Sequence, residues 1–176
     1  MIPRSRRSRL AAFVSASLAI TACGAQTSDK AGVDEEGDSD PRGTYDIDRE
    51  TGETSARYVD EAGTTTTMRS GQKVPVSLPQ NFTVFPGATV TNNTRVERAG
   101  GQLVLLALES EATPDEMIAH YRAQAEAAGI DVAMALETGA TQMIGGERPD
   151  GTSFSFTAKR EEDLTEAQLS IGRGLE

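Results

Sequence analysis

The clearest structural signal in this chain is a helix between Thr113 and Gly129, which carries both a start and a stop signal. Thr113-Pro114-Asp115-Glu116 has the form of a capping box, with Thr at the N-cap, Pro at the first helical position and Glu at the third. Gly129 is a left-handed stop. An apolar stripe at helical spacing joins the two signals and contains Met117, Ile118, Tyr121, Ala125 and Ala128. We therefore predict one amphipathic helix that ends near Ala128.

The residues on both sides of this helix have the spacing of β-strands. Residues 88–96 alternate between apolar and polar, and the uninterrupted apolar run 103–108 suits a central strand that is covered on both faces. Four more strand-like runs follow the helix, separated by hairpin-length turns, at residues 130–136, 142–144, 154–158 and 167–171. The order ββαββββ over residues 72–176 predicts an α+β domain. We expect a two-layer sandwich of a mainly antiparallel sheet and one packed helix.

Residues 44–71 are polar but patterned. Turn signals at 50–53 and 60–63 separate short runs rich in Thr, Tyr and Val, which favour strands. These runs predict a possible β-meander. Because its apolar content is thin, we expect it to pack on the main domain or to fray.

The N-terminus has the charge pattern of a secretory signal peptide. Residues 1–9 contain four arginines and no acidic residue, and the next 13 residues, from Leu10 to Ala22, carry no charge. A basic region followed by an apolar region of this length is typical of a signal peptide. It is too short for a transmembrane helix, which needs about 20 apolar residues.

The cleavage region Leu18-Ala19-Ile20-Thr21-Ala22-Cys23 resembles a bacterial lipobox. Small side chains at Thr21 and Ala22 allow the strand to enter a membrane-embedded peptidase. The resemblance implies that residues 1–22 are a lipoprotein signal peptide, cleaved between Ala22 and Cys23, and that the thiol of Cys23 is linked to diacylglycerol. The alternative is an ordinary signal peptide followed by a chance cysteine.

The residues after Cys23 are expected to form a tether. Between residues 24 and 43 there are six acidic and two basic residues and only three apolar ones. Such a segment cannot offset the entropy of ordering, so residues 23–43 are predicted to be a lipidated cysteine and a disordered acidic tether.

Charge and the lipobox together predict where the mature chain resides. Loss of residues 1–22, with their four arginines, takes the net charge from −10 to −14, so anionic headgroups repel the chain and the lipid must anchor it. Gly24 stands where many lipoproteins retained in the inner membrane have Asp. The resemblance therefore implies the periplasmic face of the outer membrane.

Composition excludes several classes of function. A sequence pI of about 4.6 and the lack of a basic stripe argue against a nucleic-acid partner. One cysteine and one histidine exclude a disulfide framework and the multi-Cys or multi-His metal sites. A calcium loop counted from Asp38 or Asp46 places arginines at ligand positions, so solvated acids are the better interpretation. We expect no metal site, no cofactor and no catalytic residue.

His120 is the one residue that titrates near neutrality without perturbation. It borders the predicted apolar stripe, which favours a half-buried packing role. Catalysis would require a nucleophile and an orienting acid within hydrogen-bond distance, and its helical neighbours Glu116 and Gln124 are not nucleophiles.

Two functions from different classes remain. The first is a membrane-anchored envelope lipoprotein with a small non-catalytic binding or adaptor domain, whose ligand or envelope partner is unknown. The alternative is an envelope hydrolase that uses carboxylates; carboxylates converging in a cleft would favour it. The phrases Phe85-Pro86-Gly87-Ala88 and Ala127-Ala128-Gly129 faintly resemble small uncharacterised envelope domains of proteobacteria, which implies no activity.

Overall fold

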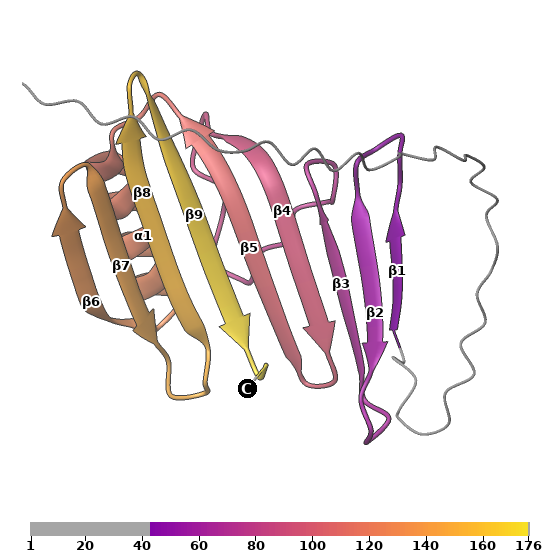
Figure 1. Cartoon of the computed structure of the whole chain (residues 1–176). Helices are drawn as coiled ribbons and strands as arrows, with labels where there is room; N and C mark the ends of the chain where they lie inside the picture. The colour runs from indigo at the N-terminus through magenta and orange to yellow at the C-terminus, as the bar shows by residue number, and fades with distance from the viewer. Residues whose placement is uncertain (1–42, 176) are drawn as a thin grey trace, which may run out of the picture. The chain divides into compact units, whose positions relative to one another are not determined.

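A computed structural model describes residues 43–175, which form one antiparallel sheet of nine strands and one helix (Figure 1). The strand order across the sheet is β1-β2-β3-β4-β5-β9-β8-β7-β6. Ala22, Cys23 and almost all of the predicted tether lie outside the described residues. The strands are β1 (Gly43–Ile47), β2 (Thr54–Val59), β3 (Thr65–Gly71), β4 (Thr89–Arg98), β5 (Gly101–Ser110), β6 (Asp131–Thr138), β7 (Thr141–Glu147), β8 (Ser153–Glu161) and β9 (Leu164–Arg173).

The predicted fold class, a two-layer α+β sandwich, is wrong, although the element order ββαββββ is the one found between residues 72 and 175. The described chain is mainly antiparallel β-sheet, and residues 43–71 add three strands to the same sheet through the β3–β4 ladder. The helix α1 (Pro114–Ala127) packs mainly on β6, β7 and β8. The prediction for residues 44–71 was based on their low apolar content. Strands β1–β3 join the sheet through backbone hydrogen bonds, which polar side chains do not prevent.

Helix α1 forms where the sequence predicts it. The hydroxyl oxygen of Thr113 accepts a hydrogen bond from the backbone N–H of Glu116 at 3.3 Å, and the Glu116 carboxylate accepts from the N–H of Thr113 at 2.8 Å. These bonds from Thr113 lower the pKa of Glu116. At the other end Gly129 takes a φ of +77°, which turns the chain toward β6.

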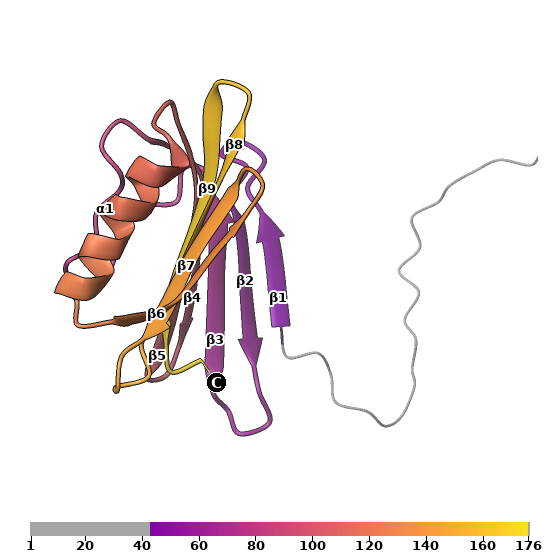
Figure 2. The same ribbon diagram turned by 90° about the vertical axis from the view of Figure 1, so that its left-hand side faces the viewer.

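The hydrophobic core lies on one face of the sheet, under α1 and the segment between β3 and β4 (Figure 2). Tyr121 is its central aromatic residue, with a ring centroid 4.3 Å from that of Phe156. Its hydroxyl accepts a hydrogen bond from the N–H of Phe85 at 3.1 Å, which fastens the β3–β4 segment to the helix. Burial raises the pKa of Tyr121 to about 12.

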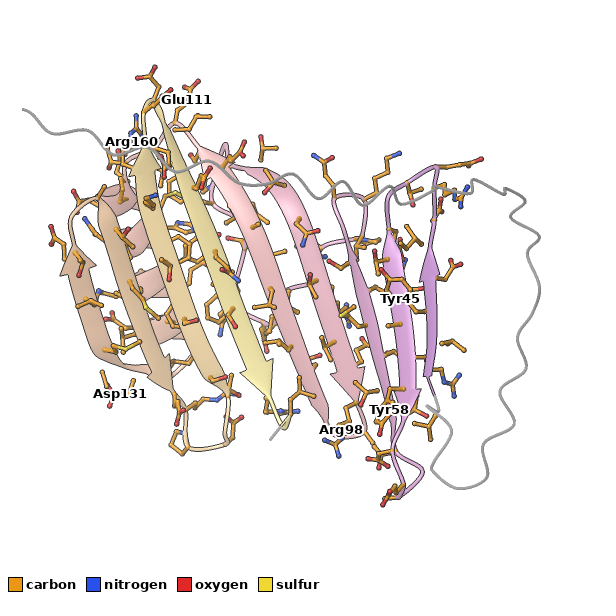
Figure 3. The ribbon with its side chains drawn as sticks, in the orientation of Figure 1. Tyr45, Tyr58, Arg98, Glu111, Asp131 and Arg160 are labelled. Carbon is orange, nitrogen blue, oxygen red and sulfur yellow. The ribbon has the colours of Figure 1, made fainter. Side chains whose placement is uncertain are left out.

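The other face of the sheet carries a row of cross-strand neighbours on five adjacent strands. Strand register aligns Tyr45, Ala56, Met68, Val96 and Leu103, one residue each from β1 to β5. Figure 2 shows α1 on the opposite side. Tyr45, labelled in Figure 3, is 67% exposed, so this face leaves apolar side chains in contact with solvent.

The side chain of Arg160 joins the residues just before α1 to the β8–β9 hairpin, a contact that we call the Arg160 clamp. Arg160 donates hydrogen bonds to the carbonyl oxygens of Glu111 at 3.1 Å, Ala112 at 3.2 Å and Asp163 at 2.7 Å. Figure 3 labels Arg160 and Glu111 at this end of β8. The hydroxyl of Thr165 donates to the same carbonyl of Ala112 at 2.6 Å. One side chain thus joins two segments that are far apart in sequence.

Tyr121→Ala should lower the free energy of unfolding by about 3–4 kcal/mol, because it removes a large buried ring. Tyr121→Phe keeps the ring but leaves the N–H of Phe85 without its acceptor, so we expect a smaller loss of about 1–2 kcal/mol. Urea denaturation measures both. A loss below about 1 kcal/mol for the alanine variant would contradict the assigned core.

Arg160→Lys should lower the free energy of unfolding by about 1–3 kcal/mol, since an ammonium group cannot reproduce the planar fork that reaches several carbonyls. Arg98→Lys is the matched control. Arg98 forms an ion pair with Asp60 at 3.4 Å near the surface, and such pairs contribute about 0–1 kcal/mol. Equal losses in the two variants would argue against the clamp.

Candidate binding site

His120 lies in a packed and hydrogen-bonded position. Its ring makes edge contacts with Phe85 and Tyr121, with centroid distances of 5.0 Å to each. Its Nε2 lies 2.8 Å from the side-chain nitrogen of Gln124, which also donates to the hydroxyl of Thr83 at 2.8 Å. Because the Oε1 of Gln124 accepts from the N–H of Thr83 at 3.0 Å, its amide nitrogen faces His120 as a donor, an arrangement that suits an unprotonated Nε2.

The surroundings of His120 indicate a structural role. Its hydrogen-bond partner within residues 43–175 is Gln124, which is neither a nucleophile nor an acid. Burial lowers the pKa of His120, which favours the neutral ring that the Gln124 contact requires. The side chain connects α1 to the β3–β4 segment rather than to a reacting group.

A cavity of about 280 Å³ lies beside the C-terminal end of α1, on the same face as the helix. Phe82, Ile130 and Ile171 line it and are buried, so its inner surface is apolar. Exposed side chains of Gln80 and Arg173 also line it. The cavity lies past the end of α1, where β5 begins and β9 ends.

The loop at residues 79–82 forms one wall of this cavity. The N–H of Phe82 donates to the carbonyl oxygen of Pro79 at 3.1 Å, which closes a tight turn. Asn81 within it has a φ of +75°, a left-handed conformation that Asn tolerates better than most residues. The turn directs the Phe82 ring inward, where it stacks on Phe154 with centroids 5.7 Å apart.

Two arginines give the cavity a positive edge. Arg148 donates to the carbonyl oxygen of Ala128 at 3.1 Å and to the carboxylate of Asp150 at 2.9 Å. The hydrogen bonds from Arg148 hold the pKa of Asp150 well below its usual range. Arg173 reaches no closer than 3.8 Å to that carboxylate and is 56% exposed. Asp and Glu are absent from the lining.

Among residues 43–175, the buried polar side chains are Asn93, Ser110, Thr152 and Thr165, with no carboxylate among them. The same residues contain no cluster of three or more His, Cys, Asp or Glu side chains able to hold a metal ion. No helix within this range is long and apolar enough to cross a membrane.

Sequence reasoning did not identify the cavity. Arg148 follows β7 and Arg173 ends β9, and neither lies in a motif. Arg173 lies opposite Gln102 in the β5–β9 ladder, and this pairing can be known only from the strand register. Of the two starting points weighed for a calcium loop, Asp38 lies outside the described residues and Asp46 lies in β1. Asp48 serves the β1–β2 turn: its carboxylate accepts from the N–H groups of Thr51 and Glu50, which lowers its pKa.

His120 should make the fold less stable at mildly acidic pH. Its folded-state pKa is lowered, so the unfolded chain binds the proton first as pH falls below about 6.5, and stability is lost in that range. We expect the free energy of unfolding to fall between pH 7.5 and 5, and to fall less in His120→Gln, which cannot titrate. Urea denaturation at both pH values tests this. Identical pH dependence in the two proteins would refute it.

A scan against protein-family models and searches of curated proteins and of solved structures found no match to this chain.

Proposed function

We propose that this protein is a membrane-anchored lipoprotein of the bacterial envelope, and that its folded domain binds a ligand without catalysing a reaction. The cavity beside the end of α1 carries this proposal. It combines a buried apolar lining with guanidinium groups at its edge, the usual character of a small-molecule site. An adaptor role toward an envelope protein would use the open face of the same sheet.

The anchor rests on the sequence around Cys23. The lipobox resemblance, the basic N-terminal region and the uncharged segment 10–22 support export and lipid attachment. Gly24 supports delivery to the periplasmic face of the outer membrane. Two or more acyl chains together give a durable anchor, whereas one chain gives only marginal binding. No charge attraction is available to replace them, because the mature chain is strongly acidic.

The hydrolase alternative finds less support. It needs carboxylates in a cleft. Glu109 and Glu166 lie opposite each other in the β5–β9 ladder, but the groove that they line with Lys159 is open and Glu166 is exposed. Asp150, beside the cavity at the end of α1, is paired with Arg148. The resulting low pKa of Asp150 keeps it ionised and makes it a weak general base. The other ionisable candidate, His120, is held by Gln124 and packs against aromatic rings.

Replacement of Cys23 tests the anchor. In the wild-type chain we expect removal of 22 residues, a lipid adduct on Cys23 by mass spectrometry, and recovery in the membrane fraction after a high-salt wash. Cys23→Ala should leave an uncleaved precursor or a soluble form, since no thiol can accept diacylglycerol. Thr27→Ala, a neutral change just beyond the lipobox, is the control and should behave as wild type. Wild-type protein that salt removes from membranes, or that keeps a free thiol, would overturn the lipoprotein assignment.

A further inference from the structure

We propose that the cavity beside the end of α1 binds a small apolar carboxylate, a molecule of about ten heavy atoms with one negative charge. This inference rests on the binding role proposed above and names the chemical class of the ligand. It follows from the size of the cavity, its apolar lining and the unequal state of its two arginines.

The volume sets the size of the ligand. A dry apolar cavity of about 150 Å³ accommodates benzene, which has six heavy atoms. By the same ratio, the 280 Å³ found here accommodates roughly ten or eleven. The buried Phe82, Ile130 and Ile171 offer this ligand aromatic and aliphatic contacts rather than polar ones. The body of the ligand is therefore a short alkyl chain or a single ring.

The two arginines have different roles. Arg148 donates to Asp150, to the carbonyl oxygen of Ala128 and, at 3.2 Å, to the hydroxyl of Thr152, so most of its donors are engaged. These bonds hold the Arg148 side chain in place in the wall of the cavity. The guanidinium of Arg173 forms one ion pair within residues 43–175, at 3.8 Å to Asp150, so most of its donors are available. Such a fork matches the two oxygens of a carboxylate.

The local charge selects a monoanion. Arg148, Arg173 and Asp150 together carry one net positive charge, and the cavity lining adds no acid. A single carboxylate neutralises this cluster. A dianionic phosphate would leave excess negative charge beside Asp150, in a chain with a net charge of −10. An alkylammonium ion would face two guanidinium groups and is disfavoured.

Octanoate, with ten heavy atoms, is the probe. Isothermal titration calorimetry would use the full chain in phosphatidylcholine nanodiscs, with empty nanodiscs as reference, and would compare octanoate with octan-1-ol and octylamine. We expect saturable one-site binding of octanoate with a dissociation constant below about 1 mM, which a ligand of this size can reach. The alcohol should bind at least about tenfold more weakly, and the amine should not bind.

Variants locate the site. Arg173→Gln should weaken octanoate binding about tenfold, because it removes a hydrogen bond to a charged group, and should leave octan-1-ol binding unchanged. Arg173→Lys should retain part of the affinity. Arg98→Gln is the matched control on the opposite face of the sheet and should change affinity less than twofold. Ala128→Leu, which narrows the cavity and keeps both arginines, should weaken octanoate and octan-1-ol alike.

The outcomes separate this inference from the lipoprotein assignment. Equal binding of octanoate and octan-1-ol, no saturable binding, or equal loss in Arg173→Gln and Arg98→Gln would each overturn the carboxylate site. Thermal unfolding of each variant without ligand distinguishes lost affinity from lost folding. Octanoate binding by a chain whose Cys23 carries no lipid would support the site and reject the anchor.

Discussion

The antiparallel ladder between β5 and β9 joins the two halves of this sheet. Every other pair of neighbouring strands is consecutive in sequence, so β1–β5 and β6–β9 are two meanders of local hairpins. The β5–β9 register runs from Gln102 opposite Arg173 to Ser110 opposite Thr165. Its first pair lies at the cavity and its last at the Arg160 clamp. The helix connects the two meanders, and its two ends lie where this ladder begins and ends.

The parts of the structure that could be predicted are those with local causes. The capping box and Gly129 act within a few residues, so the helix was predicted to within a residue of each end. The predicted sheet had too few strands. Strands β1–β3 belong to it through backbone pairing, and their low apolar content does not reveal such pairing. Asn93 shows the same limit: it reads as a polar surface residue, yet it is buried and donates to the carbonyl oxygens of Val74 and Pro75.

The two faces of the sheet differ because one helix cannot cover nine strands. The helix reaches β6–β8, and the β3–β4 segment extends the covered area through Phe82 and through Val74, whose carbonyl oxygen accepts a hydrogen bond from Asn93 of β4. Beyond this area the sheet is a single layer whose stability comes from its ladders and from cross-strand contacts such as Ser70 with Thr94, 2.7 Å apart. The row from Tyr45 to Leu103 on the open face is therefore available for contacts outside the domain.

The position of the cavity couples binding to the most non-local part of the fold. Arg173 ends β9, Ile171 precedes it on the same strand, and Gln102 faces it from β5. A ladder between strands so distant in sequence carries the largest loop-closure entropy in this sheet. A ligand that binds Arg173 in the folded state alone stabilises that state by mass action. Occupancy of the cavity would thus favour the contact that holds the two meanders together, and a weakened ladder would lower affinity without any change in the lining residues.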